Sequence, residues 1–110
     1  MAIYFKTDSP QQLLSSFKKA IADKDVVTWS CDSDGDFTHA TEQWKRLAWL
    51  RPAIQTGYLV MNIIKPQNKT ISTEVYAIYH GRFIESMLAH FDKEFSDARA
   101  SSIPASGDLI

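Results

Sequence analysis

Residues 71–95, ISTEVYAIYHGRFIESMLAHFDKEF, decide the fold because their hydrophobic period changes at Gly81. In residues 71–80 the side chains alternate with a period of two, which is typical of a β-strand. In residues 83–95 the apolar side chains recur at close to 3.6 residues, which is typical of an amphipathic helix. We therefore expect a strand that leads directly into a helix.

The expected helix has a large apolar stripe on one side. The stripe consists of Phe83, Ile84, Met87, Leu88, Phe91 and Phe95. Because a fully buried side chain of this kind contributes roughly 1.5–3 kcal/mol, the stripe must be covered. We expect this helix to pack on a sheet.

The preceding segments predict one more helix and several strands. Ser9, Pro10 and Gln12 have the pattern of an N-cap, a first helical residue and a capping-box partner, so a helix begins there. The dipeptide Asp34-Gly35 between two β-type segments predicts a hairpin turn. We expect strands over residues 2–6, 26–32, 37–39, 41–54 and 58–64.

The resulting element order is strand, helix, four or five strands joined by hairpins, and helix. This order predicts an α+β fold, with an antiparallel sheet of about five strands and two helices packed on one face. With 110 residues and 45% hydrophobic content, the chain fits one domain over residues 1–100. Residues 101–110 are small and polar and contain Pro104 and Gly107, which predicts a loosely held tail.

Charge and cysteine content exclude several classes of function. The formal net charge is −1 with both signs mixed along the chain, so no global field attracts nucleic acid or an anionic membrane. The single Cys31 cannot form an internal disulfide, and the N-terminal residues have no long apolar run. No apolar run approaches the roughly 20 residues of a membrane helix. We expect a cytoplasmic protein.

The acidic run over residues 32–36 resembles the start of a calcium loop only at first sight. Asp32, Asp34 and Asp36 alternate, but glycine stands fourth rather than sixth, and Gln43 stands twelfth where the loop requires Glu. The run is typical of a solvated hairpin turn. We expect neither a metal site nor a cofactor.

The junction between the expected strand and helix offers a candidate anion site. His80 and Arg82 would lie at the helix N-terminus, where four backbone N–H groups lack helical partners. A phosphate or carboxylate could bind there, with Arg82 as a bidentate clamp. The alternative is that Arg82 pairs with Glu85 or with an acidic residue on a neighbouring strand.

Histidines are the main candidates for proton transfer. His39 and His80 each end an expected strand, so they would meet at one rim of the sheet if those strands were neighbours. The chain has no nucleophile-elbow serine and no glycine-rich phosphate loop, and Cys31 has no activating base near it in the sequence. We assign no catalytic residue.

The chain has more large aromatic side chains than one helix-covered sheet face is expected to bury. They are Trp29, Trp44, Trp49, Tyr58, Tyr76 and Tyr79. If some lie on the uncovered face, they form a binding surface rimmed by Lys45, Arg46, Arg51 and Glu74. The alternative is a strongly curved sheet that wraps them around the helices. Stacking on single-stranded bases is a further use of such residues, but the near-neutral charge argues against it.

Two functional hypotheses follow. The first is a non-catalytic binding domain that forms a homodimer through an aromatic sheet face containing Trp49 and Tyr76. The second is a ligand-binding or enzymatic pocket for an anionic small molecule, in which His80 and Arg82 hold the anion. In that pocket His39 or a tyrosine, such as Tyr79, would handle a proton.

Overall fold

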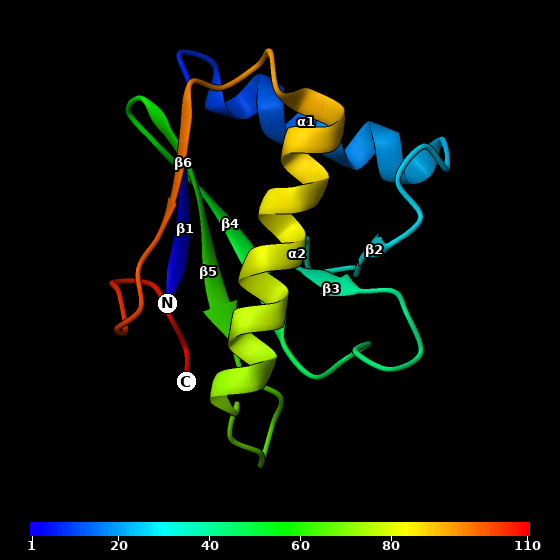
Figure 1. Cartoon of the computed structure of the whole chain (residues 1–110), viewed down its shortest axis with the longest axis vertical. Helices are drawn as coiled ribbons and strands as arrows, with labels where there is room; N and C mark the ends of the chain where they lie inside the picture. Colours follow the sequence, from blue (N-terminus) through cyan, green and yellow to red (C-terminus); the bar gives the residue numbers. More distant parts are fainter.

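Six strands form one antiparallel sheet in the order β2-β3-β4-β5-β1-β6 in the computed structural model, which describes residues 1–110. The elements in chain order are β1 (Ala2–Lys6), α1 (Pro10–Ala22), β2 (Trp29–Cys31), β3 (Phe37–His39), β4 (Trp49–Gln55), β5 (Tyr58–Ile64), α2 (Thr73–Phe91) and β6 (Asp97–Ala100). The predicted α+β fold class is confirmed, with six strands rather than about five. Figure 1 shows α2 running lengthwise over the sheet and α1 lying across it near the C-terminal end of α2.

Both helices pack on one face of the sheet through aromatic side chains. Phe17 of α1 and Phe83 of α2 have ring centroids 5.0 Å apart. Each also contacts Phe37 of β3, at 5.0 Å and 6.3 Å respectively. Phe5 of β1 lies 5.8 Å from Phe83. The core therefore lies between the two helices and the sheet, and the opposite sheet face carries no helix.

The predicted strand over residues 71–80 is wrong, because α2 is one continuous helix from Thr73 to Phe91. Ser72 is the N-cap, and its side chain accepts a hydrogen bond from the N–H of Val75 at 3.2 Å. Apolar side chains occupy both alternating sets of this segment, so Val75, Tyr76 and Tyr79 also have the i, i+1, i+4 spacing of a helical face. Tertiary packing then decides between the two structures.

Residues 73–78 of α2 are exposed or half-buried, and the buried residues of α2 form one stripe over the rest of the helix. They are Tyr79, His80, Phe83, Ser86, Met87 and Phe91. Gly81 marks no boundary, since it lies inside α2. The helix therefore begins ten residues earlier than the sequence predicts, at Thr73 instead of Phe83.

The predicted hairpin over residues 32–36 is confirmed by the antiparallel pairing of β2 with β3. Asp32 Oδ1 accepts hydrogen bonds from the N–H groups of Asp34 and Asp36, both at 2.9 Å. Gly35 adopts φ +85°, which favours glycine. The Asp36 carboxylate is bound by the Arg51 guanidinium at 2.9 and 3.0 Å.

Two local predictions differ from the structure near the start of α1 and before β4. Ser9 precedes α1 but its side chain makes no capping bond, while Gln12 donates to Ser16 at 3.3 Å, so the capping box is absent. The strand predicted over residues 41–54 begins only at Trp49. Residues 41–47 form turns instead, and Arg46 has φ +59°, which is incompatible with a strand.

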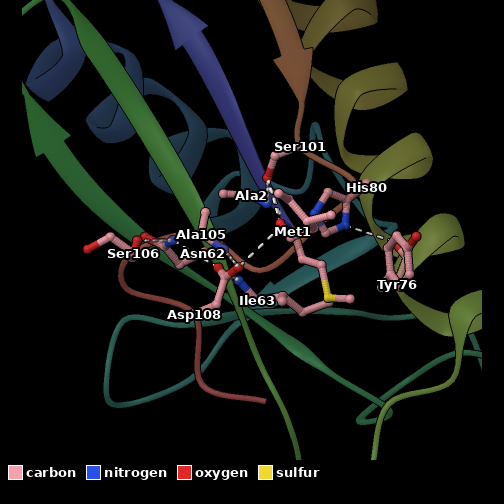
Figure 2. A network of polar contacts seen from close by, with 11 residues as sticks. Met1, Ala2, Asn62, Ile63, Tyr76, His80, Ser101, Ala105, Ser106 and Asp108 are labelled. Atoms are coloured by element: carbon pink, nitrogen blue, oxygen red, sulfur yellow. Dashed lines mark hydrogen bonds and ion pairs between the residues drawn. The ribbon is translucent and has the colours of Figure 1, made fainter.

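The C-terminal segment differs from the predicted loosely held tail, because it binds β1 and β5. Asp108 has only 1% of its side chain exposed. Its carboxylate accepts hydrogen bonds from Asn62 Nδ2 at 2.9 Å, the N–H of Ile63 at 3.2 Å and the N–H of Ala105 at 2.7 Å. The ammonium group of Met1 lies 3.4 Å away (Figure 2). Backbone hydrogen bonds from Ser101 to Ala2 of β1 and from Leu109 to Ile63 of β5 add to this buried carboxylate in anchoring the segment.

We predict that Asp108→Ala lowers the free energy of unfolding by about 1–3 kcal/mol, because the buried donors around this carboxylate lose their acceptor. Urea denaturation measures the change. Asp8→Ala is the matched control, since Asp8 is exposed and makes no hydrogen bond. Equal stability of the two variants would contradict the anchoring role of Asp108.

Candidate functional site

A polar pocket of about 260 Å³ lies between the β3–β4 connection and the middle of α2. Its lining residues come from the segment before β2, from β3 and the connection after it, and from α2. They are Thr28, His39, Thr41, Gln43, Trp44, Arg82, Glu85 and Ser86. The pocket thus brings together two of the residues that the sequence analysis selects, His39 and Arg82, although they come from different elements.

His39 presents one hydrogen-bond donor to this pocket. Its Nδ1 lies 3.3 Å from the backbone N–H of Thr41, which can only donate, so Nδ1 is an acceptor and the proton of the neutral ring is on Nε2. The Thr41 hydroxyl lies 2.9 Å from the same Nδ1. Nε2 has no hydrogen-bond partner within the chain and is not fully buried, so it is available to a ligand.

The surroundings of His39 fix the ring and keep it neutral. The side chain is 4% exposed and packs against Trp29 at 5.0 Å and Tyr79 at 6.1 Å between ring centroids. Burial lowers the pKa of His39 below 6.5, and the positive charge of Arg82 lowers it further. At neutral pH the pocket therefore contains a neutral imidazole that donates from Nε2.

Arg82 supplies the positive charge of the pocket. Its guanidinium lies 3.6 Å from the Glu85 carboxylate, and these side chains are 51% and 68% exposed. The predicted alternative, an Arg82–Glu85 pair, therefore exists, but an exposed pair at this distance contributes little to stability. The predicted position of Arg82 at a helix N-terminus is wrong, because Arg82 lies in the middle of α2.

His80 does not line this pocket, and the condition under which His39 and His80 would meet is not fulfilled, because His80 lies on α2 and not on a strand. His80 is 5% exposed and lies beside Met1 and Tyr76, as Figure 2 shows. Its Nδ1 donates to the carbonyl oxygen of Tyr76 at 2.8 Å, which leaves Nε2 buried without a partner. The rings of Tyr76 and His80 are 5.6 Å apart, so both belong to the packing of α2.

Tyr79 supports the pocket from inside the core. Its hydroxyl donates to the carbonyl oxygen of Trp44, accepts from the N–H of Leu47 at 3.3 Å, and lies 3.0 Å from the Thr38 hydroxyl. These bonds hold the β3–β4 connection against α2. Tyr79 is thus a positioning residue rather than a ligand contact.

The sheet face without a helix forms a second candidate surface. Trp49 and Ile64 are cross-strand partners on it, and Leu109 forms a parallel bridge with Ile64. Because bridge partners point to the same side, these three side chains form an apolar row. Tyr58 and Tyr4 also lie on this face, with ring centroids 6.5 Å apart.

Several residues expected on that surface lie elsewhere. Trp29 and Tyr79 are buried in the core. For these two residues the alternative prediction is correct, namely that they pack with the helices and not on an open face. Tyr76 and Glu74 belong to α2. Arg51 is on the open face and pairs with Asp36.

Thr41, Glu85 and Ser86 are pocket residues that the sequence analysis did not select. A local signal exists for Thr41, because a hydroxyl two residues after a histidine can bond its ring nitrogen. The i, i+3 spacing on a helix identifies Glu85 as a partner of Arg82 but does not show that Glu85 lines a pocket. No group of three His, Cys, Asp or Glu side chains is placed to hold a metal ion.

Comparison with protein-family models, curated proteins and solved structures finds no match to this chain. Neither helix combines the length and the apolar character needed to cross a membrane.

We predict that folding stability decreases as pH falls from about 7.5 to about 5.5. Burial is the main cause that lowers the pKa of both His39 and His80 from 6.5, so the unfolded chain binds protons more readily than the folded one. The stability that the two neutral rings contribute is fully present above the histidine pKa of the unfolded chain. It is lost as pH falls through the lower pKa values of the folded protein. Chemical denaturation at several pH values measures this slope.

His80→Gln should flatten the slope, while His90→Gln, an exposed change on the same helix, should leave it unchanged. The slope is the informative quantity, because loss of a buried ring lowers absolute stability at every pH. A His80→Gln slope equal to that of the wild type would show that His80 protonation is not coupled to folding.

Proposed function

We propose that this protein is a small non-catalytic binding domain whose pocket recognises the anionic group of a small ligand. One observation carries the proposal: the Nε2–H of His39 and the guanidinium of Arg82 line the same pocket, and neither has a strong partner. Both groups donate hydrogen bonds without accepting them in this state. Carboxylate and phosphate oxygens complement such a donor pair.

The state of His39 favours binding over catalysis. A general base at Nε2 needs a lone pair there, but Thr41 occupies Nδ1 as donor and so leaves the proton on Nε2. Cys31, the only thiol, does not line the pocket. The proposal therefore assigns ligand contact, not proton transfer, to His39.

The size of the pocket supports a small ligand. A volume of 260 Å³ corresponds to about nine water molecules at the liquid volume of roughly 30 Å³ each. This is slightly below the range of roughly 300–1,000 Å³ for drug-sized ligands. The proposal includes neither nucleic acid nor a membrane as partner, in agreement with the net charge of −1.

A second candidate function is self-association through the open sheet face. It is supported by the apolar row of Trp49, Ile64 and Leu109, of which Leu109 is 53% exposed. A homodimer would cover this row by placing the same face of two chains together. We also propose a cytoplasmic location, which the single unpaired Cys31 supports.

We predict that sulfate binds in the pocket and that Arg82→Gln weakens this binding by about tenfold or more, since charge-assisted hydrogen bonds are lost. Titration followed by ¹H–¹⁵N NMR measures affinity and location together. Arg99→Gln is the matched control, because Arg99 lies over Tyr4 on the open face. Unchanged sulfate affinity in Arg82→Gln would contradict the proposal.

We predict that Trp49→Ala shifts a dimer toward monomer, because it removes the largest side chain of the apolar row. Light scattering after size-exclusion chromatography over a range of concentrations measures the mass. Tyr76→Ala, on α2, should leave the mass unchanged. A monomeric wild type, or a normal dimer in Trp49→Ala, would exclude this interface.

A further inference from the structure

The pocket contains a negative charge as well as a positive one. Arg82 and Glu85 are its only charged side chains at neutral pH, since His39 is neutral and the other lining residues carry no charge. Its formal charge is therefore zero. A ligand with only an anionic group takes Arg82 from Glu85 but gives the Glu85 carboxylate no new partner, so it binds more weakly than a ligand that carries both charges.

The Arg82–Glu85 pair is suited to separation by a ligand. The two groups are 3.6 Å apart, belong to the same helix at positions i and i+3, and are both more than half exposed. Such a pair contributes little, so exchanging it for ligand contacts costs little. A ligand that provides its own cation would give Glu85 a new partner when its anion occupies Arg82.

We propose that the ligand of this pocket is a small zwitterion, such as a free amino acid, whose carboxylate is bound by Arg82 and His39 and whose ammonium is bound by Glu85. This proposal rests on the anion-binding function proposed above. The uncharged groups of Thr28, Gln43 and Ser86 supply further hydrogen bonds. The volume of 260 Å³ suits a molecule of this size with some water.

The experiment compares each standard L-amino acid with its N-acetyl derivative, which retains the carboxylate but lacks the positive charge. NMR titration of the full chain gives both affinities. We expect at least one amino acid to bind about tenfold more tightly than its N-acetyl derivative. In Glu85→Gln this ratio should fall to about one, while sulfate still binds.

Glu74→Gln is the control, because Glu74 is an exposed acidic residue of α2 outside the pocket. It should retain the preference for the charged amine. Equal affinity of the wild type for amino acids and their N-acetyl derivatives, or a preference that persists in Glu85→Gln, overturns the zwitterion proposal. In those cases sulfate binding that depends on Arg82 would still stand, so failure here is distinguishable from failure of the anion-binding function.

Discussion

The burial of Phe83 is the interaction on which the rest of the structure depends. Its ring lies 5.0 Å from Phe17 of α1, 5.1 Å from Trp29 of β2 and 5.8 Å from Phe5 of β1. One side chain of α2 therefore contacts the other helix and two separate parts of the sheet. A fully buried aromatic side chain contributes about 1.5–3 kcal/mol, so this contact fixes how α2 is rotated on the sheet.

That rotation determines the pocket. With Phe83 inward, its neighbour Arg82 and the following Glu85 lie at the edge of the buried stripe, where they line the same pocket as His39 at the end of β3. Tyr79, one turn before Phe83, binds the carbonyl oxygen of Trp44 and the N–H of Leu47, and so holds the β3–β4 connection, which supplies part of the pocket lining, against α2. The geometry of the site is thus a consequence of core packing rather than of a separate loop structure.

The fold class was predictable because most elements carry local signals. The continuous apolar run of β5 and the Asp-Gly turn before β3 each identify their structure from neighbouring residues. The start of α2 was not predictable in this way, since residues 72–79 satisfy both periods. Ser72 was the overlooked cap signal, and its meaning depends on whether the following residues are helical.

The site was predictable only in part. His39 and Arg82 were recognisable as candidate ligand-binding residues. That they line one pocket depends on how α2 crosses the sheet, and hydrophobic periodicity in the sequence does not specify this crossing. His80 and His39 are apart for a related reason. The sequence predicts a strand that ends at His80, but these residues belong to α2. Tyr79 is buried because α2 extends further toward the N-terminus than the pattern predicts, and Trp29 is buried because its ring packs against Tyr79 and Phe83.

The most direct test of this account is long-range ¹H–¹⁵N NMR of the His39 imidazole at neutral pH, with and without sulfate. The account predicts that Nε2 carries the proton, that Nδ1 does not, and that the Nε2 resonance moves on addition of sulfate while that of the exposed His90 does not. A proton on Nδ1, or an Nε2 resonance that does not move at saturating sulfate, would contradict the proposed role of His39.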